Sequence, residues 1–322
     1  MKTGLSLYPC SGGFCRDPLA DHGIGSKASR FLERHDYTVQ HGRIVYSPIS
    51  RIIIGSIMRA NSIKQLLKSG KPAVGTWLSL GNILAARFLA RTGFDWLTVD
   101  IEHSLVGIET AVHMWGAIAD AGCVPLARVP SNRHDHIKRV LDNGGYGVVV
   151  PMVCTRQESI DAVAACLYPP TGNRSVGGSV HALNFSATPA EYYNRANGEI
   201  LIVLQCEHID AVRNFDEVYG VPGVDAIFVG PNDLAASMRS PDGQPPSGEA
   251  FQAALAEILA GCKRLGIAAG IHTFNTEEAK MRIAQGWQFI AINSELKFMM
   301  DGAKQTLDGL GLQKGAADLA KY

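Results

Sequence analysis

Residues 200–233 read ILIVLQCEHIDAVRNFDEVYGVPGVDAIFVGPND and contain two apolar runs separated by a helical pattern over 209–219. Each run is a nearly continuous series of Val, Ile, Leu and Phe, which is typical of a strand buried on both faces. Such strands occur in parallel sheets covered by helices, because the connection between parallel strands crosses a face of the sheet. The stretch therefore predicts a strand–helix–strand unit of an α/β fold.

The same alternation continues over most of the chain from about residue 70 onward. We predict strands at 73–80, 96–101, 124–129, 147–153, 200–206, 224–230, 268–272 and 289–293. We predict helices at 82–92, 108–121, 134–143, 156–166, 209–219, 249–265, 276–285 and 296–309. These ranges make eight units, and eight parallel strands close a (β/α)8 barrel whose interior is filled by side chains.

The competing α/β architecture is an open, doubly wound sheet. That fold needs a Gly-rich phosphate turn after its first strand, and GTWLSLGN at 75–82 has no such fingerprint. We therefore expect a TIM barrel within residues 58–322. Residues 1–57 have no lasting period, and only RIVYSPISRIIIGSIM at 43–58 suggests a short strand or helix. We predict that this segment is a poorly ordered or peripheral extension.

Composition excludes several classes of partner. The chain has 322 residues, which suffices for one barrel of about 250 residues plus an extension. Thirty basic and thirty acidic residues cancel, so neither a nucleic-acid-binding nor an anionic-membrane-binding surface is expected. No apolar stretch approaches the ~18 residues of a membrane span. Seven cysteines are scattered along a chain too large to need disulfides, and we expect a reducing, cytoplasmic location.

One long connection interrupts the alternation. Residues 167–199 contain YPPTGNRSVGG, and a structureless connection of this length in a compact domain is usually a lid or a binding loop. Gly172, Gly177 and Gly178 permit close approach of backbone amides to a ligand, and Arg174 offers a contact for an anion. The alternative is an ordinary surface excursion.

Acidic residues follow two neighbouring predicted strands. Glu207 comes after the strand at 200–206, and Asp233 comes after the strand at 224–230. Because the carboxyl ends of parallel barrel strands meet at one face, the two acids would converge and form an oxygen site for a hard divalent cation. Waters and a bidentate substrate would complete its coordination. In the alternative interpretation each acid caps the following helix, as Asp233 could do.

Further polar residues lie at the ends of two earlier predicted strands. Arg128 could bind a carboxylate or phosphate in a forked geometry, or it could form a structural ion pair. His103 lies beside Asp100 and Glu102, and a nearby acid raises the basicity of an imidazole, so His103 is a candidate general base. Asp142, at the end of a predicted helix, is a second possible carboxylate partner for this His.

A metal, an anion-binding Arg and a base indicate one class of reaction. The cation would chelate a 2-oxo acid, and loss of a proton or cleavage of a C–C bond would generate an enolate whose charge the cation and Arg stabilise. A Schiff-base aldolase would need a buried Lys on a strand. No predicted strand contains a Lys, which disfavours that mechanism.

At this point the chain resembles the HpcH/HpaI aldolase family of metal-dependent 4-hydroxy-2-oxoheptanedioate and 2-dehydro-3-deoxyglucarate aldolases. The resemblance covers about residues 60–300 and rests on GFDWLTVDIEHS, ARVP, IKRVLDNGGYGVVVPMV, YPPTGNRSVGG, LQCEHIDAVRN and GVDAIFVGPNDLAASM, in family order and spacing. It implies a (β/α)8 barrel, a Mg²⁺, Mn²⁺ or Co²⁺ ion, and a homo-oligomer, commonly a hexamer of swapped dimers.

Matching these blocks also implies roles for single residues. Glu207 and Asp233 would bind the metal, and His103 would be the base, supported by Asp100 and Asp142.

Further matches concern the substrate. Arg128 would hold the enolate or ketone oxygen, and Gln205 would support the metal-bound substrate. Backbone amides around Asn232 and Asp233 would take the pyruvate carboxylate.

Three segments depart from the family pattern. Residues 1–57 have no counterpart, RSPDGQPPSGEA at 239–250 lacks the usual His-Pro, and the last strand ends in NSELKF at 293–298. The second difference affects an expected contact between subunits, and the third affects the distal part of the substrate pocket.

The sequence supports three functional hypotheses. The first is a class II pyruvate aldolase that reversibly cleaves a 4-hydroxy-2-oxo acid into pyruvate and an aldehyde. The second keeps the pyruvate enolate but changes its partner, as in oxaloacetate decarboxylation. The third is a ligand-binding barrel without catalysis, which the acids at successive strand ends argue against.

Overall fold

A computed structural model of the chain describes residues 37–40, 43–46 and 58–311. These residues fall into two units, a short hairpin and a barrel. In the hairpin, β1 (Tyr37–Gln40) pairs with the antiparallel strand β2 (Arg43–Tyr46). β2 lies within the apolar stretch that suggests a short element, whereas the sequence pattern does not predict β1. Other predictions for residues 1–57 lie outside the described residues.

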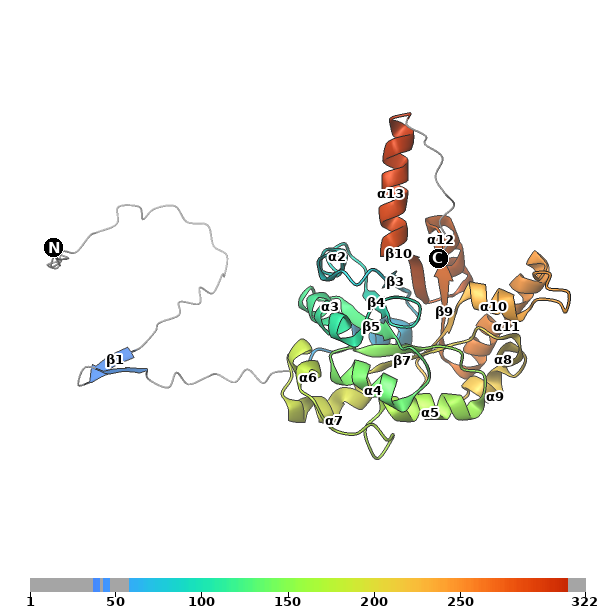
Figure 1. Ribbon diagram of the computed structural model, residues 1–322. Coiled ribbons are helices and arrows are strands. Elements are labelled where there is room, and N and C mark those ends of the chain that lie inside the picture. The colour runs from blue at the N-terminus through green and yellow to red at the C-terminus, as the bar shows by residue number, and fades with distance from the viewer. Residues whose placement is uncertain (1–36, 41–42, 47–57, 312–322) are drawn as a thin grey trace, which may run out of the picture. The chain divides into compact units, whose positions relative to one another are not determined.

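Eight parallel strands close into a barrel within residues 58–311. They are β3 (Ala73–Leu78), β4 (Trp96–Asp100), β5 (Val124–Arg128), β6 (Gly147–Val150), β7 (Leu201–Gln205), β8 (Ala226–Val229), β9 (Ala268–Thr273) and β10 (Phe289–Ser294). Each strand pairs with the next one along the chain, and β10 pairs with β3 to complete the ring (Figure 1). The predicted TIM barrel is confirmed.

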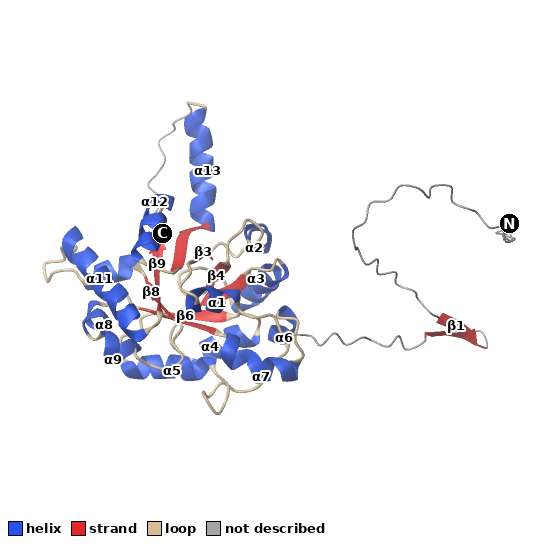
Figure 2. Ribbon diagram, turned by 180° about the vertical axis from the view of Figure 1, so that it is seen from behind, coloured by secondary structure: helices blue, strands red, loops and turns tan. Residues whose placement is uncertain are grey.

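The helices lie around these strands (Figure 2). They are α1 (Ser62–Lys68), α2 (Ile83–Leu89), α3 (Ile108–Asp120), α4 (His134–Asp142), α5 (Arg156–Cys166), α6 (Val180–Asn184), α7 (Pro189–Glu199), α8 (Ile209–Arg213), α9 (Phe215–Tyr219), α10 (Pro231–Ser237), α11 (Gly248–Leu265), α12 (Thr276–Gln285) and α13 (Glu295–Gly309). All predicted helices are present, although Asn214 divides the one at 209–219 into α8 and α9.

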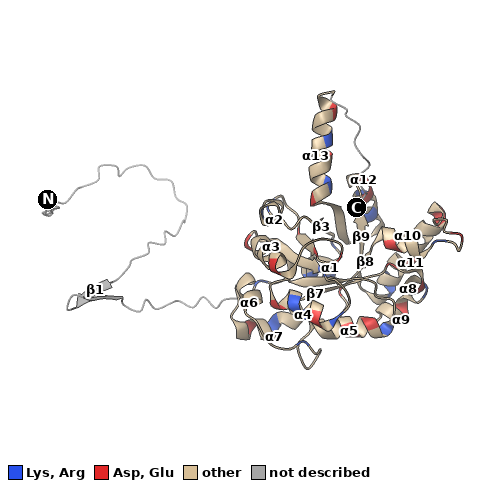
Figure 3. Ribbon diagram, viewed as in Figure 1, with Lys and Arg blue, Asp and Glu red and all other residues tan. Residues whose placement is uncertain are grey.

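Charged residues of both signs are spread over the barrel helices (Figure 3), in line with the balanced composition. Across residues 58–311, no helix is both long and apolar enough to cross a bilayer.

Local sequence signals explain where several helices begin and end. Thr155 and Glu158 form a reciprocal capping box at the start of α5, which satisfies backbone N–H groups that lack a partner within the helix. The Asn275 side chain caps α12 by accepting the Glu278 N–H. α11 ends at Gly266 with a φ of 67°, a left-handed conformation that favours glycine.

The structure corrects the expectation of a structureless binding loop at 167–199, because α6 and α7 occupy much of this segment. A Cβ on Gly172 would overlap the carbonyl oxygens of Ala164 and Leu167, so this glycine permits close packing of the chain against itself. Arg174 is fully buried and pairs with Asp142, with 2.8 Å between Nη2 and Oδ1. Arg174 is therefore a structural residue rather than an exposed contact for an anion.

Aromatic side chains fill part of the barrel interior. Trp96 and Phe289 stack with their ring centroids 4.3 Å apart, and Phe228 packs edge-on against Phe289 and against Trp77. Gly75, which pairs with Trp96 between β3 and β4, leaves the space that the indole occupies, and a Cβ at this position would overlap the ring. The interior layer therefore depends on a glycine opposite a tryptophan.

We predict that Gly75→Ala destabilises the barrel, because both the indole and the backbone of Trp96 would have to move. Overpacking of this kind should lower the Tm by about 5 °C or more, measured by thermal unfolding. Gly116→Ala is the matched control: Gly116 lies within α3, and its Cβ would meet no atom within 4 Å. This control should keep or raise the Tm, because alanine favours the helix. Equal Tm values for the two variants would contradict this account of the core.

Candidate active site

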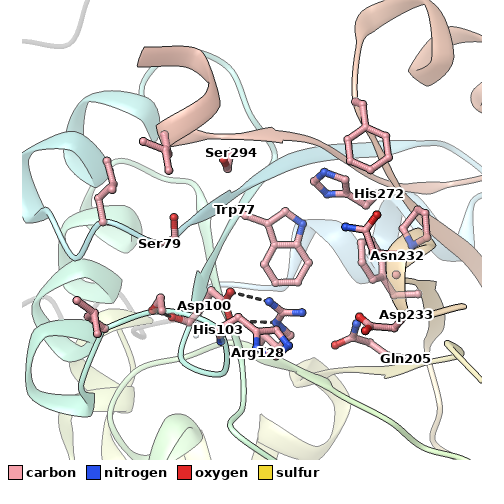
Figure 4. A pocket seen from close by; sticks show the side chains of 18 residues that line it. Trp77, Ser79, Asp100, His103, Arg128, Gln205, Asn232, Asp233, His272 and Ser294 are labelled. Carbon is pink, nitrogen blue, oxygen red and sulfur yellow. Dashed lines mark hydrogen bonds and ion pairs between the residues drawn. The ribbon is translucent and has the colours of Figure 1, made fainter. Parts of the chain in front are cut away.

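A pocket of about 310 Å³ opens at the carboxyl ends of the barrel strands (Figure 4). Residues within or directly after seven of the eight strands line it. They are Trp77, Ser79 and Leu80 at β3; Asp100, His103, Ser104 and Leu105 at β4; Arg128 at β5; Gln205 at β7; Phe228, Gly230, Pro231, Asn232 and Asp233 at β8; His272 and Phe274 at β9; and Ser294 and Leu296 at β10. The convergence follows from the parallel arrangement, which brings all these strand ends to one face.

Arg128 is the centre of an ion-pair network on one side of the pocket. Its Nε and Nη2 donate to the two carboxylate oxygens of Asp100, at 2.9 and 2.6 Å, and its Nε lies 3.2 Å from Oε2 of Glu102. The guanidinium also lies over the Trp77 ring, 4.8 Å from the ring centre. Asp100 and Arg128 are paired residues of neighbouring strands, so the barrel register itself brings them together. These contacts fix the guanidinium in one orientation.

His103 lies at the mouth of the pocket, where half of its side chain is exposed. The backbone N–H groups of Glu102 and His103 both donate to Oδ1 of Asp100, which makes the chain turn as it leaves β4. The Nε2 of His103 is 3.8 Å from Oε2 of Glu102, beyond hydrogen-bonding distance. The imidazole is therefore accessible to a ligand and has a carboxylate nearby.

Glu207 is nearly inaccessible to solvent, at 3% exposed, and lies behind Gln205. Its Oε1 accepts the backbone N–H of Met152 at 2.8 Å, and its Oε2 accepts Nε2 of Gln205 at 2.7 Å. A Cβ on Gly230 would lie 2.6 Å from Oε2 of Glu207 and 3.8 Å from Oδ2 of Asp233. Both carboxylates therefore border the space over Gly230, and only a glycine leaves that space open.

The carboxylates in this region outnumber the cations that could neutralise them. Burial raises the pKa of Glu207 to about 7, and the charges of Asp233 and Glu102 contribute to the rise. Burial also raises the pKa of Glu102, which Arg128 counteracts. Arg128 is the only Lys or Arg among the lining residues described. The site therefore has an excess of acidic groups that an added cation would stabilise.

The donor set fits a hard divalent cation. Glu207 and Asp233 offer carboxylate oxygens beside one open space, and the amide oxygen Oε1 of Gln205 is buried without a hydrogen-bond partner. Oxygen donors of these types are the ligands that Mg²⁺ and Mn²⁺ prefer. Within residues 58–311, no three His, Cys, Asp or Glu side chains converge on one point. Substrate and water would therefore have to supply the other ligands, as in a catalytic rather than a closed structural site.

The structure brings together most of the residues that the sequence singled out. Six of them line the pocket: Asp100, His103, Arg128, Gln205, Asn232 and Asp233. Glu207 lies directly behind this lining.

Two predicted site residues lie elsewhere in the chain. Asp142 is at the end of α4, where it binds Arg174 and its carbonyl oxygen contacts Nδ1 of His181. Neither Asp142 nor Gly177 is among the residues that line this pocket. Their predicted roles toward His103 and the substrate stay predictions.

Sequence reasoning did not single out Trp77 and His272 as pocket residues. Trp77 lies inside the predicted strand at 73–80, and an apolar run buried on both faces does not show which side chains point to the barrel mouth. His272 closes the predicted strand at 268–272, so the rule that selected the other strand ends could have found it.

Comparison with known proteins agrees with this geometry. Residues 73–302 match the family described as HpcH/HpaI aldolase/citrate lyase. A 4-hydroxy-2-oxo-heptane-1,7-dioate aldolase from Salmonella arizonae is 34% identical over 255 residues, which is 79% of this chain and 96% of that protein. The protein of the same name from Escherichia coli strain ATCC 8739 is 34% identical over 263 residues, covering 81% and 99%.

Solved structures show the same relationship. An HpcH/HpaI aldolase/citrate lyase family protein from Burkholderia cenocepacia superposes with a TM-score of 0.71 at 32% identity, over 78% of this chain and 99% of that one. The match of the family to most of the barrel, with two relatives above 30% identity along nearly their whole length, is decisive. The chain belongs to the HpcH/HpaI aldolase/citrate lyase family.

Proposed function

We propose that the protein is a divalent-metal-dependent pyruvate aldolase, which reversibly cleaves a 4-hydroxy-2-oxo acid into pyruvate and an aldehyde. Membership of an aldolase/citrate lyase family supports a carbon–carbon lyase. The observation that carries the finer proposal is that Glu207 and Asp233 both approach the space over Gly230, next to the pocket that Arg128 and an accessible His103 line.

Glu207 and Asp233 would hold the metal, which is Mg²⁺, Mn²⁺ or Co²⁺ in this proposal, with Gln205 beside it. When bound, such a cation polarises the 2-oxo group of the substrate and offsets the negative charge that develops on it. The hydrogen bond from the Met152 N–H orients the Glu207 carboxylate. Met152 has a left-handed φ of 51°, which is unfavourable for a residue other than glycine and is typical of functional sites.

The remaining polar groups would orient the substrate. α10 begins at Pro231, and no side chain caps its first backbone N–H groups, so the amides around Asn232 and Asp233 are available to the pyruvate carboxylate. Asp100 engages Nε and Nη2 of Arg128, and no described residue accepts a hydrogen bond from Nη1. Nη1 is therefore free to donate to the 2-oxo oxygen of the substrate.

In the cleavage direction His103 would act as the general base. It removes the proton of the 4-hydroxyl group, the C3–C4 bond breaks, and C4 leaves as the aldehyde carbonyl. The electron pair of the broken bond forms the pyruvate enolate, whose oxygen Arg128 stabilises through its positive charge. Return of a proton to C3 completes pyruvate. In the synthetic direction the same groups act in reverse order.

We also propose that the enzyme works as a homo-oligomer, with the hexamer that the family resemblance implies. α13 extends away from the barrel (Figure 1), and Glu295 is its only buried residue. Its exposed side chains include Met299, Met300 and Leu307, an apolar surface that a neighbouring subunit would cover. We expect sedimentation equilibrium to give a mass of six chains. A monomer at micromolar concentration would contradict this part of the proposal.

We predict that Glu207→Gln and Asp233→Asn abolish metal-dependent pyruvate release, because each removes a charged ligand while keeping the side-chain shape. Calorimetry should show Mn²⁺ affinity weakened by about 100-fold or more, on the order of 3 kcal/mol. Asp216→Asn is the matched control, because Asp216 lies on the exposed surface and pairs with Arg264. EDTA should stop release by the wild-type enzyme, and Mn²⁺ should restore it. Release that persists in EDTA would refute the proposal.

We predict that Mn²⁺ affinity increases with pH up to about 7 and then levels off, because the cation binds the ionised Glu207, whose pKa burial raises to about 7. The affinity should weaken by about tenfold per pH unit on the acid side. Binding at low pH should release a proton, which calorimetry in buffers of different ionisation enthalpy detects. Affinity that does not change with pH would contradict the role of Glu207.

The raised pKa of Glu207 also makes the stability of the folded protein depend on pH. Between the ordinary pKa of 4.5 and about 7, the folded state keeps the Glu207 proton that the unfolded chain has lost. This group therefore makes the metal-free protein less stable as the pH rises through that range.

A further inference from the structure

His272 places an imidazole in the pocket that the proposed mechanism does not use. It comes from β9 and lines the pocket beside Phe274, against whose ring it packs edge-on at a centroid distance of 5.0 Å. Figure 4 shows it on the same side of the pocket as Asn232. A substrate that fills the pocket would therefore come close to His272.

The imidazole has no hydrogen-bond partner in the described part of the chain. Its Nε2 is buried and unsatisfied, and no contact within residues 58–311 occupies Nδ1 either. A buried polar group without a partner is costly, and in a native protein it calls for an explanation such as a ligand or an ordered water. Because Nε2 is closed off from the pocket, Nδ1 is the nitrogen that a ligand there would reach.

The protonation state of His272 determines which ligand groups can form a hydrogen bond with it. Burial lowers the pKa of His272 to about 4, with a further contribution from the positive charge of Arg128, so the imidazole is neutral at ordinary pH. A neutral imidazole has one donor and one acceptor nitrogen. A carboxylate only accepts hydrogen bonds, whereas a hydroxyl group both donates and accepts. A hydroxyl therefore matches either tautomer of His272.

The charge of the lining disfavours a substrate with a second carboxylate. Arg128 is the only Lys or Arg among the described lining residues, and Asp100 and Glu102 already pair with it. The other lining side chains are acids, amides, imidazoles, hydroxyls and apolar groups, and none of them is a Lys or Arg. A second carboxylate would therefore lose its hydration without gaining a cationic partner.

We propose that His272 is a specificity-determining residue that hydrogen-bonds a hydroxyl group of the substrate, and that the substrate is a hydroxylated 2-oxo acid with a single carboxylate. This inference rests on the proposed aldolase function. The hydroxyl could belong to the donor, as in hydroxypyruvate, or to the aldehyde, as in glycolaldehyde. The chemistry at His272 is the same in both cases.

The test measures kcat/KM for aldol addition with Mn²⁺, by chromatography and mass detection of the products. Pyruvate and hydroxypyruvate are the donors. Glycolaldehyde, its near-isostere propanal, and succinic semialdehyde are the acceptors. We expect at least one hydroxylated reactant to exceed its counterpart without the hydroxyl by about tenfold or more. Whether the preference follows the donor or the acceptor identifies which reactant carries the hydroxyl.

His272→Leu should reverse this preference, lowering kcat/KM for the hydroxylated reactant by about tenfold and raising it for the other. His272→Gln, which keeps a neutral donor and acceptor, should restore part of the preference. His113→Leu, at an exposed position on α3, is the matched control.

Three outcomes would overturn the inference while leaving the aldolase in place. The first is equal rates for hydroxylated and unhydroxylated reactants. The second is an unchanged preference in His272→Leu with a wild-type Tm. The third is a preference for succinic semialdehyde over glycolaldehyde. No product from any pair would instead refute the proposed function itself.

Discussion

Four carboxylates share the mouth of the barrel with one guanidinium, and the organisation of the site depends on this imbalance of charge. Asp100 and Glu102 take up the charge of Arg128 through direct contacts. Glu207 is left with neutral donors only, and burial keeps its pKa near 7. Buried acids without a countercharge are unfavourable, so the presence of several in one region indicates a missing positive charge. A divalent cation would supply it, and such a cation would also stabilise the enolate of the proposed reaction.

The barrel makes this arrangement possible because it fixes the strand ends relative to one another. Pairing of Asp100 with Arg128 across β4 and β5 is a direct consequence of strand register. Where β10 pairs with β3 and closes the barrel, the register shifts between Ala291 and Ser294. The buried Glu295 that follows accepts the backbone N–H of Leu80 at 2.6 Å. The loop after β3 is thereby tied to the start of α13, directly after β10, and residues from both segments line the pocket.

The barrel was predictable because continuous apolar runs and helical periods are local signals, and all eight strands appear within a few residues of the expected ranges. Short helices such as α6 and α10 were not predictable, since five to seven residues hold too little periodic pattern. Most of the site residues were predictable because they lie at the carboxyl ends of predicted strands. Trp77 did not, because an apolar run hides which side chains face the mouth. The burial of Arg174 against Asp142 is a long-range packing effect that no local pattern reports.

The proposed active site depends on one cation that the acids following β7 and β8 hold jointly. Its most direct test is an anomalous difference map from a crystal of the enzyme soaked in Mn²⁺. We expect a single strong peak within coordination distance of carboxylate oxygens from both Glu207 and Asp233, in the space that Gly230 leaves open. A peak that contacts only one of these acids, or a fully occupied Mn²⁺ site elsewhere with this space filled by water, would contradict it.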